Sequence, residues 1–248
     1  MTFGITDFID LHPRVVCKKL AAHFFDRHYK LGLEWYRKQM PVSNIDQITI
    51  ETTPDYFQYE FIPNFIFKMN PSMKLIAIIR NPVKRAISEF TKIKGQEGYV
   101  FDSKNYNSVS KLFEETVLDE NGNVNRNNYY IKNGLYVEHL KNWLKYFPFE
   151  QIHIVDGEKI IIDPHGVMVE VEKFLNVDPF IKKENFVYSK DRGFMCINEL
   201  DSKTTKCQDG TSAREQPYIP EFIQNRLKDF YKKYDEELFE LLNREPFW

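Results

Sequence analysis

The apolar positions of the chain repeat with two spacings, one typical of amphipathic helices and one typical of buried strands. Apolar side chains three and four residues apart predict helices at Phe3–Leu11, Val83–Phe90, Val109–Leu118, Tyr136–Phe147, Pro164–Leu175 and Pro220–Leu241. Short apolar or alternating runs predict strands at Gln47–Ile50, Leu75–Ile79 and Gln151–Val155. Strands that alternate with helices favour a parallel sheet covered on both faces. We therefore expect one three-layer α/β domain over residues 1–248.

The segment Lys74–Phe90 carries the strongest local signal. The strand Leu75–Ile79 is followed by Arg80 and by Asn81-Pro82, a favoured helix cap and a favoured first helical residue. A helix that starts here would aim free backbone N–H groups and its positive dipole end at one spot. Arg80 at that spot and Ser88 further along predict half of a nucleotide-phosphate site. The alternative is an arginine that pairs with a neighbouring carboxylate.

Composition and charge narrow the class of protein. The 248 residues are 42% hydrophobic and 15% aromatic, which favours a packed globular protein over a disordered one. The formal net charge of −2 gives no overall attraction to a polyanion, so we expect no nucleic-acid partner. No apolar run approaches the roughly 18 residues of a membrane span. The N-terminal residues lack the basic and apolar regions of a signal peptide. An unrelated P-loop kinase is disfavoured because the Gly-x4-Gly-Lys-Ser/Thr motif is absent.

The three cysteines leave two alternatives open. Cys196 and Cys207 lie close in sequence, joined by a polar segment, and a disulfide between them would stabilise the fold by roughly 3 kcal/mol. The other alternative is three reduced thiols, Cys17 included, in a cytosolic protein.

Several further motifs occur in a fixed order together with Lys74–Phe90. They are His23–Arg27 (HFFDR), Gly32–Tyr36 (GLEWY), Ile50–Pro54 (IETTP), Phe147-Pro148 with His153–Gly157 (HIVDG), and Arg192–Cys196 (RGFMC). In order and spacing the chain resembles the heparan sulfate glucosamine 3-O-sulfotransferases, from about Leu11 to Trp248. The resemblance implies a P-loop-kinase-like sulfotransferase fold with a central parallel sheet.

The resemblance also implies a cofactor and a compartment. Such proteins use 3′-phosphoadenosine 5′-phosphosulfate as sulfate donor, need no metal, and act in the Golgi lumen on a glucosamine 3-hydroxyl of heparan sulfate. By resemblance, Arg80 and Ser88 bind the 3′-phosphate of the cofactor. Met195 lines the cofactor, and Cys196 and Cys207 form a disulfide. Ser212-Ala213-Arg214 matches a Lys-Gly-Arg segment that closes over the cofactor, so Ser212 and Arg214 are expected cofactor contacts.

On the acceptor side, the resemblance assigns His23, Asp26 and Arg27 to binding of the glucosamine and its neighbouring uronate. The alternative is structural: His23 would be a core histidine between aromatic side chains, and Asp26 and Arg27 would form a local ion pair.

The sequence departs from the family at the sulfuryl end of the site. The position of the catalytic Glu is Ala21, a Lys of the family is Thr52, and the phosphate-cradle loop would fall at or before Met1. We therefore expect a divergent member with an incomplete N-terminus and impaired transfer. The alternative is a catalytically degenerate member that acts as a glycan-binding or regulatory protein. Two roles are open for Glu51. One is a substitute base, and the other, commoner for a residue at a strand end, is an ion pair with Arg80 or Lys74.

Overall fold

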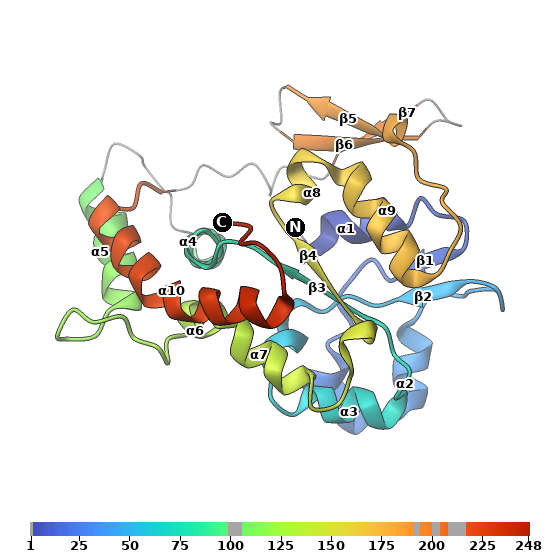
Figure 1. Cartoon of the computed structure of the whole chain (residues 1–248), viewed down its shortest axis with the longest axis horizontal. Helices are drawn as coiled ribbons and strands as arrows, with labels where there is room; N and C mark the ends of the chain where they lie inside the picture. Colours follow the sequence, from blue (N-terminus) through green and yellow to red (C-terminus); the bar gives the residue numbers. More distant parts are fainter. Residues whose placement is uncertain (1, 99–105, 191–193, 200–203, 208–216) are drawn as a thin grey trace. The chain divides into compact units, whose positions relative to one another are not determined.

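The computed structural model describes residues 2–98, 106–190, 194–199, 204–207 and 217–248 (Figure 1). The chain groups into two compact units. Unit 1 contains Met1–Ile78 and Asn142–Ala213, and unit 2 contains Ile79–Lys141 and Arg214–Trp248. The single domain over residues 1–248 stays a prediction.

The described strands form three small sheets. Strand β1 (Val15–Cys17) pairs in parallel with β2 (Ile48–Ile50), and β3 (Leu75–Ile79) pairs with β4 (Ile152–Asp156). An antiparallel sheet follows, with β5 (Phe186–Ser189), β6 (Phe194–Glu199) and β7 (Thr204–Lys206) in that order. The predicted strands at 47–50, 75–79 and 151–155 are confirmed within one residue. The sequence missed the antiparallel sheet because its strands are short and mix apolar with polar side chains.

Helices α1 (Thr2–Ile9) and α9 (Pro164–Leu175) build the main core of unit 1. They pack apolar side chains against β1 and β4, among them Ile5, Phe8, Ile9, Val15, Val155, Val167, Met168 and Val171. Helix α9 begins at Pro164 because Asp163 Oδ1 accepts the N–H of Gly166 at 3.0 Å. The remaining helices of this unit are α2 (Gly32–Gln39), α3 (Ile62–Met69) and α8 (Lys159–Ile162).

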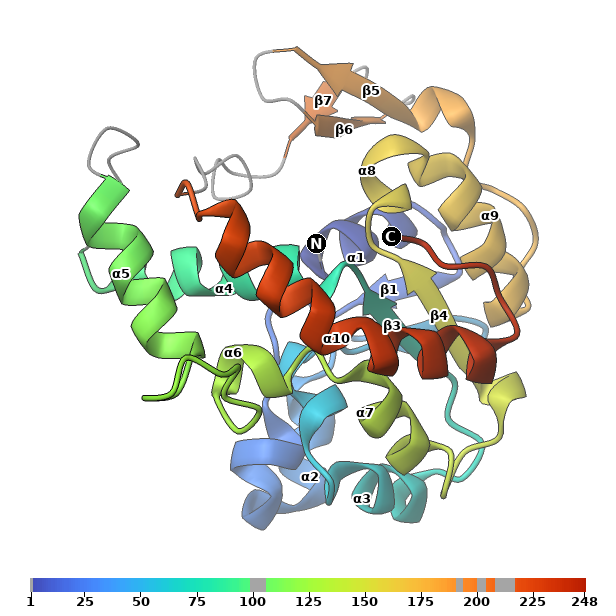
Figure 2. The ribbon, with the colours of Figure 1, turned by 60° about the vertical axis from the view of Figure 1, so that its left-hand side comes forward.

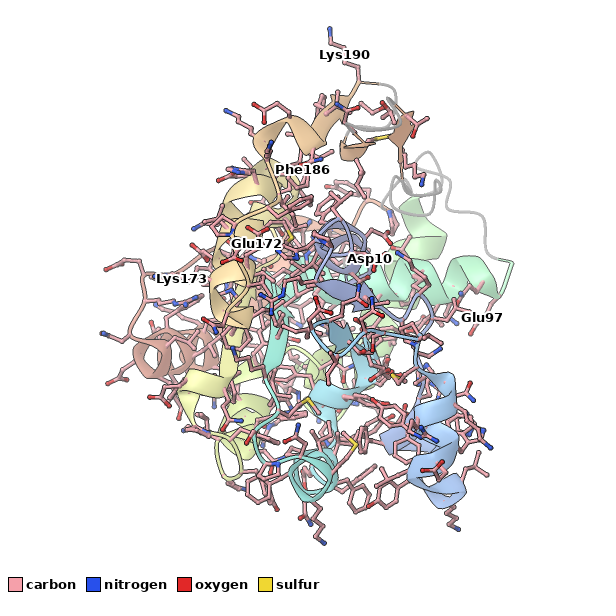
Figure 3. All side chains as sticks on the ribbon, turned by 90° about the vertical axis from the view of Figure 1, so that its right-hand side faces the viewer. Asp10, Glu97, Glu172, Lys173, Phe186 and Lys190 are labelled. Atoms are coloured by element: carbon pink, nitrogen blue, oxygen red, sulfur yellow. A yellow bond between two sulfur atoms is a disulfide. The ribbon has the colours of Figure 1, made fainter. Side chains whose placement is uncertain are left out.

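A buried carboxylate holds the connection that follows α9. Glu172, labelled in Figure 3, is 1% exposed. Its Oε1 accepts the backbone N–H groups of Phe180 and Ile181 at 3.0 and 2.8 Å. Two charge-assisted bonds to Oε1 offset part of the cost of burying the carboxylate, whose Oε2 is buried without a hydrogen-bond partner among the described residues. Glu172 thus has a structural role.

Unit 2 is helical. It contains α4 (Pro82–Gln96), α5 (Tyr106–Val117), α6 (Tyr129–Lys132) and α10 (Glu221–Leu242), and α7 (Tyr136–Trp143) lies at its boundary. Helix α4 lies beside α6 and α10 (Figure 2). The predicted inner face of α4 is buried, with Val83, Ala86, Ile87 and Phe90 at most 6% exposed. On α10, Ile223 is buried, whereas its neighbour Phe222 is exposed.

The start of α4 confirms the predicted cap and corrects the expectation of free N–H groups. Asn81 Oδ1 accepts the N–H of Val83 at 3.0 Å and that of Lys84 at 3.1 Å, and the N–H of Arg85 bonds to the Asn81 carbonyl. Pro82 has no N–H. Each first-turn donor of α4 therefore already has a partner within the chain.

The disulfide alternative is confirmed, because Cys196 and Cys207 are bonded and join β6 to β7. Cys17 is a buried free thiol whose pKa is raised to about 12, mainly by burial. Among the described helices, none has the length and apolar character that crossing a bilayer requires.

The C-terminal residues close the core of unit 2 over a carboxyl group. Trp248 Nε1 donates to Asp235 Oδ2 at 2.8 Å, and the Trp248 ring packs edge-on against Phe239. Burial raises the pKa of Asp235 from 3.8 to about 6, although the bond from Trp248 lowers it.

Replacing Asn81 tests the cap of α4. We expect Asn81→Ala to lower the free energy of unfolding by about 1 kcal/mol, because two N–H groups lose their acceptor. Asn81→Asp keeps an acceptor oxygen and serves as the control. Urea denaturation followed by circular dichroism measures the difference. Equal stability of Asn81→Ala and the unaltered protein would contradict the capping role.

Asp235 predicts a pH dependence of stability. Its carboxyl binds its proton more tightly in the folded protein than in the unfolded chain, so stability falls as the pH rises from about 4 through 6. Asp235→Asn removes this loss, on the order of 2 kcal/mol, while keeping an acceptor for Trp248. Thermal melts of both proteins across this pH range measure the effect. Parallel curves for the two proteins would show that Asp235 does not titrate in this way.

Candidate functional site

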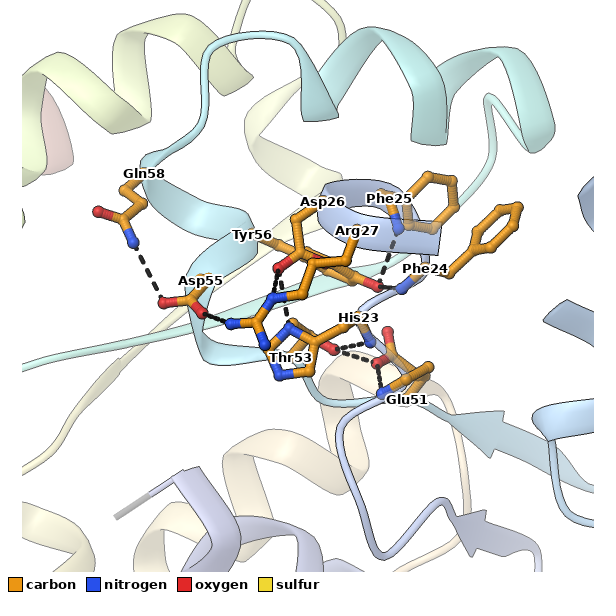
Figure 4. A network of polar contacts seen from close by, with 11 residues as sticks. His23, Phe24, Phe25, Asp26, Arg27, Glu51, Thr53, Asp55, Tyr56 and Gln58 are labelled. Carbon is orange, nitrogen blue, oxygen red and sulfur yellow. Dashed lines mark hydrogen bonds and ion pairs between the residues drawn. The ribbon is translucent and has the colours of Figure 1, made fainter. Parts of the chain in front are cut away.

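The loop that precedes His23 is held by the carboxylate of Glu51 (Figure 4). Glu51 Oε1 accepts the N–H of Ala22 at 3.1 Å and the hydroxyl of Thr53. Thr53 Oγ1 in turn accepts the N–H of His23 at 3.3 Å. These bonds join the loop to the segment that follows β2. Burial raises the pKa of Glu51, while its bonds from Thr53 and Ala22 lower it.

His23 begins a short π-helical turn in an unusual backbone conformation. Its φ of 48° and ψ of 34° lie in the left-handed region, and the turn covers Phe24–His28. The hydroxyl of Tyr56 accepts the N–H groups of Phe24 at 2.8 Å and Phe25 at 3.3 Å. The ring of Phe24 stacks on Tyr36 with centroids 4.5 Å apart. This packing offsets the backbone strain and fixes where the His23 side chain points.

The turn brings His23, Asp26 and Arg27 together, as Figure 4 shows. His23 Nδ1 lies 2.8 Å from Asp26 Oδ2, and Arg27 Nε lies 3.5 Å from the same oxygen. The Asp26 side chain is 3% exposed and that of His23 is 23% exposed. The local ion pair of Asp26 and Arg27 therefore exists. The His23 side chain is partly enclosed and keeps some exposed surface.

Arg27 links Asp26 to a second carboxylate. Its Nη2 lies 3.4 Å from Asp55 Oδ2, and its side chain is 59% exposed. Exposed pairs of this kind contribute at most about 1 kcal/mol. An anionic ligand with a better geometry can therefore recruit this guanidinium at small cost.

One set of described side chains has the spacing of a metal site. One atom each of His23, Asp26 and Asp55 lies within 4.8 Å of the others. Such a group could hold a divalent ion. The guanidinium of Arg27 reaches both carboxylates, however, and already supplies positive charge to them.

Arg80 directly follows β3, as predicted, and is half-buried, as is Ser88 on α4. Tyr136 lies close to Arg80 inside unit 2. Burial raises the pKa of the Tyr136 phenol to about 12, while the guanidinium of Arg85, and then the backbone N–H and guanidinium of Arg80, act in the opposite direction. Because the N–H groups of α4 are occupied, a phosphate here would be bound by side chains. Its binding by Arg80 and Ser88 stays a prediction.

The other predicted cofactor residues, Met195, Ser212 and Arg214, do not belong to the segment that contains Arg80 and Ser88. Met195 lies on β6 of unit 1, opposite Tyr188 of β5 and next to the disulfide at Cys196. Ser212 and Arg214 lie outside the described residues. The role of all three stays a prediction.

The two departures from the family lie beside the Glu51 network. Ala21 precedes the anchored Ala22, and Thr52 lies between Glu51 and Thr53. The expectation that Glu51 pairs with Arg80 or Lys74 is wrong for Lys74, whose Nζ donates to the Phe174 carbonyl at 2.6 Å. Glu51 instead accepts hydrogen bonds from Ala22 and Thr53.

Sequence reasoning missed the supporting roles of Thr53 and Tyr56. The polar run after β2, Glu51–Tyr56, was the available signal, because it places three hydroxyls and two carboxyls directly after a strand. The backbone partners of Thr53 and Tyr56 are 30 to 32 residues earlier in the chain, and local patterns do not specify such pairings.

Comparisons with known proteins agree on the class. A family model for the sulfotransferase domain matches residues 5–242. Heparan sulfate glucosamine 3-O-sulfotransferase 5 of Mus musculus and of Homo sapiens are each 38% identical over 250 residues, covering all of this chain and 70% of the relative. Heparan sulfate glucosamine 3-O-sulfotransferase 6 of Mus musculus is 33% identical over 248 residues, with the same coverage.

A solved structure gives the fold. The crystal structure of a sulfotransferase from Alicyclobacillus acidocaldarius matches with a TM-score of 0.67 at 17% identity, covering 98% of this chain and 91% of that chain. The predicted α/β sulfotransferase fold is thereby confirmed. Since a sulfotransferase domain matches nearly the whole chain and relatives of one kind match all of it at 33–38% identity, the chain belongs to the heparan sulfate glucosamine 3-O-sulfotransferase family.

Proposed function

We propose that this protein binds 3′-phosphoadenosine 5′-phosphosulfate and transfers its sulfuryl group to a glucosamine 3-hydroxyl of heparan sulfate, at a rate below that of its relatives. The observation that carries the proposal is the junction at which β3 ends, Arg80 follows and Asn81 begins α4. The names of the curated relatives supply the acceptor and the position of transfer.

The residues of the junction fit an anionic cofactor through their side chains. Arg80 offers a planar guanidinium whose donors match phosphate oxygens, and Ser88 offers a hydroxyl. Tyr136 lies close enough to Arg80 to interact with it electrostatically. The bound cofactor would supply the activated sulfuryl group, and Met195 would contact it from β6 together with Ser212 and Arg214.

The acceptor would be bound at the turn that carries His23, Asp26 and Arg27. A sulfated, carboxylated glycan is a polyanion, and the exposed Arg27 is held only by weak ion pairs that such a ligand can replace. The buried Asp26 fixes the orientation of His23 toward the ligand.

The reduced rate follows from Ala21 and Thr52. A methyl group at position 21 cannot take the proton of the acceptor hydroxyl, and loss of a general base typically costs a factor of about 10²–10⁴. Thr52 supplies no positive charge for the oxygen that leaves the sulfur. The same two positions favour the second candidate, a degenerate member that binds the glycan without transferring sulfate.

We also propose that the protein functions in the secretory pathway, in the Golgi lumen. The disulfide between Cys196 and Cys207 supports an oxidising compartment.

Cofactor binding is tested with 3′-phosphoadenosine 5′-phosphate and isothermal titration calorimetry. We expect Arg80→Ala to weaken binding by about 10- to 100-fold, the value of a charge-assisted hydrogen bond. Lys84→Ala is the matched control, because Lys84 is an exposed cation on the first turn of the same helix. Equal affinity of Arg80→Ala and the unaltered protein would refute the proposed phosphate site.

Transfer is tested with a radiolabelled donor and heparan sulfate, using the full-length protein. We expect turnover below that of the mouse relative and an increase of about 10²-fold in the double variant Ala21→Glu with Thr52→Lys, because base and cation are restored. Turnover equal to that of the relative would disprove the impairment. Binding of the glycan with no transfer by either protein would favour the degenerate member.

A further inference from the structure

We infer that His23 and Asp26 form a histidine–aspartate dyad in which His23 Nε2 takes the proton of the acceptor hydroxyl. The inference rests on the proposed transfer reaction and adds a catalytic residue to it. It changes the role of His23 from contact with the glycan to general base, and makes Asp26 its positioning residue.

The hydrogen bond between the two side chains determines the tautomer. An ionised carboxylate can only accept, so at 2.8 Å from Asp26 Oδ2 the His23 Nδ1 must carry a proton. In the neutral ring the lone pair then lies on Nε2. Among the described residues, none forms a hydrogen bond to Nε2, so the atom is available to a ligand. A buried carboxylate on Nδ1 and an accessible Nε2 are the arrangement of catalytic triads.

The dyad is held rigidly, and part of the His23 side chain is exposed to a ligand. Asp26 is almost fully enclosed, whereas His23 keeps 23% of its side-chain surface. The left-handed backbone at His23 and the π-helical turn after it are both rare conformations, of a kind that concentrates at functional sites. Glu51 and Thr53 hold the backbone on one side and Tyr56 on the other.

Glu51 is the competing base, and its contacts argue against it. Its Oε1 already accepts the Ala22 N–H and the Thr53 hydroxyl, so transfer of a proton to this oxygen would weaken the bonds that hold the loop. His23 Nε2 accepts no hydrogen bond from any described residue, so it can take a proton without weakening a bond that holds the loop.

Charged side chains surround the His23 ring. Asp26 bonds to Nδ1, Asp55 lies in the same cluster, and Glu51 is close enough to interact electrostatically with His23. The cations nearby are Arg27, which pairs with both aspartates, and Lys18, which acts on Glu51. The carboxylates would stabilise the imidazolium that forms.

The step balances without a further reactant. The 3-hydroxyl gives its proton to His23 Nε2 while its oxygen forms a bond to sulfur. The bond from sulfur to the phosphate oxygen of the donor breaks, and 3′-phosphoadenosine 5′-phosphate leaves with the electron pair. The imidazolium then releases its proton to water.

The test compares His23→Gln with His28→Gln, a control histidine on the same turn that packs against Trp35. In the transfer assay with full-length protein, we expect His23→Gln to lower kcat by about 10²-fold or more without changing the affinity for the cofactor product or the glycan. His28→Gln should keep the activity. Imidazole added to His23→Ala should restore part of the rate.

Nitrogen NMR of the histidine rings gives a readout that needs no activity. The resonance that disappears in His23→Gln should report a proton on Nδ1, and Asp26→Asn should shift the ring toward the other tautomer and lower kcat. Unchanged kcat in His23→Gln, or an Nε2 proton in the unaltered protein, would overturn the dyad while leaving the proposed function intact. Absence of transfer by the unaltered protein would overturn both.

Discussion

The candidate acceptor site depends on the carboxylate of Glu51, which joins two segments that are far apart in sequence. By accepting the N–H of Ala22 and the hydroxyl of Thr53, it places the start of the π-helical turn against the end of β2. Thr53 and Tyr56 extend the connection to His23, Phe24 and Phe25. Without these bonds the left-handed backbone at His23 would have no support, and its side chain would have no fixed direction.

The start of α4, where the phosphate site is proposed, uses different groups for stability and for binding. Helix α4 uses its N–H groups for its own cap, so its first turn is stable before a ligand arrives. In the proposed site, a phosphate would be recognised by side chains, chiefly the guanidinium of Arg80, whose surroundings include the buried phenol of Tyr136. The capped N–H groups thus stabilise the helix, whereas side-chain atoms of the same segment would bind the ligand.

The replacements at Ala21 and Thr52 change what the site must do. Because position 21 is an alanine, a proton acceptor must come from another side chain. The contacts of His23 and Asp26 favour this pair over Glu51. Under the proposed function, the residues that would position a glycan are retained, whereas two residues that would speed the transfer are replaced.

The sequence by itself determined the elements whose signals are local. Strand β3, the Asn81 cap and the buried face of α4 follow from apolar spacing and from the chemistry of Asn and Pro, as does the extent of α9. The resemblance in motif order identified the family, and the close spacing of Cys196 and Cys207 allowed a disulfide that the structure contains. Only the tertiary structure decided that Glu51 bonds to Ala22, that Arg27 joins Asp26 to Asp55, and that β5, β6 and β7 form an antiparallel sheet. Most of these pairings depend on chain segments 28 or more residues apart, or on strands too short to have a period of their own, and local patterns cannot specify them.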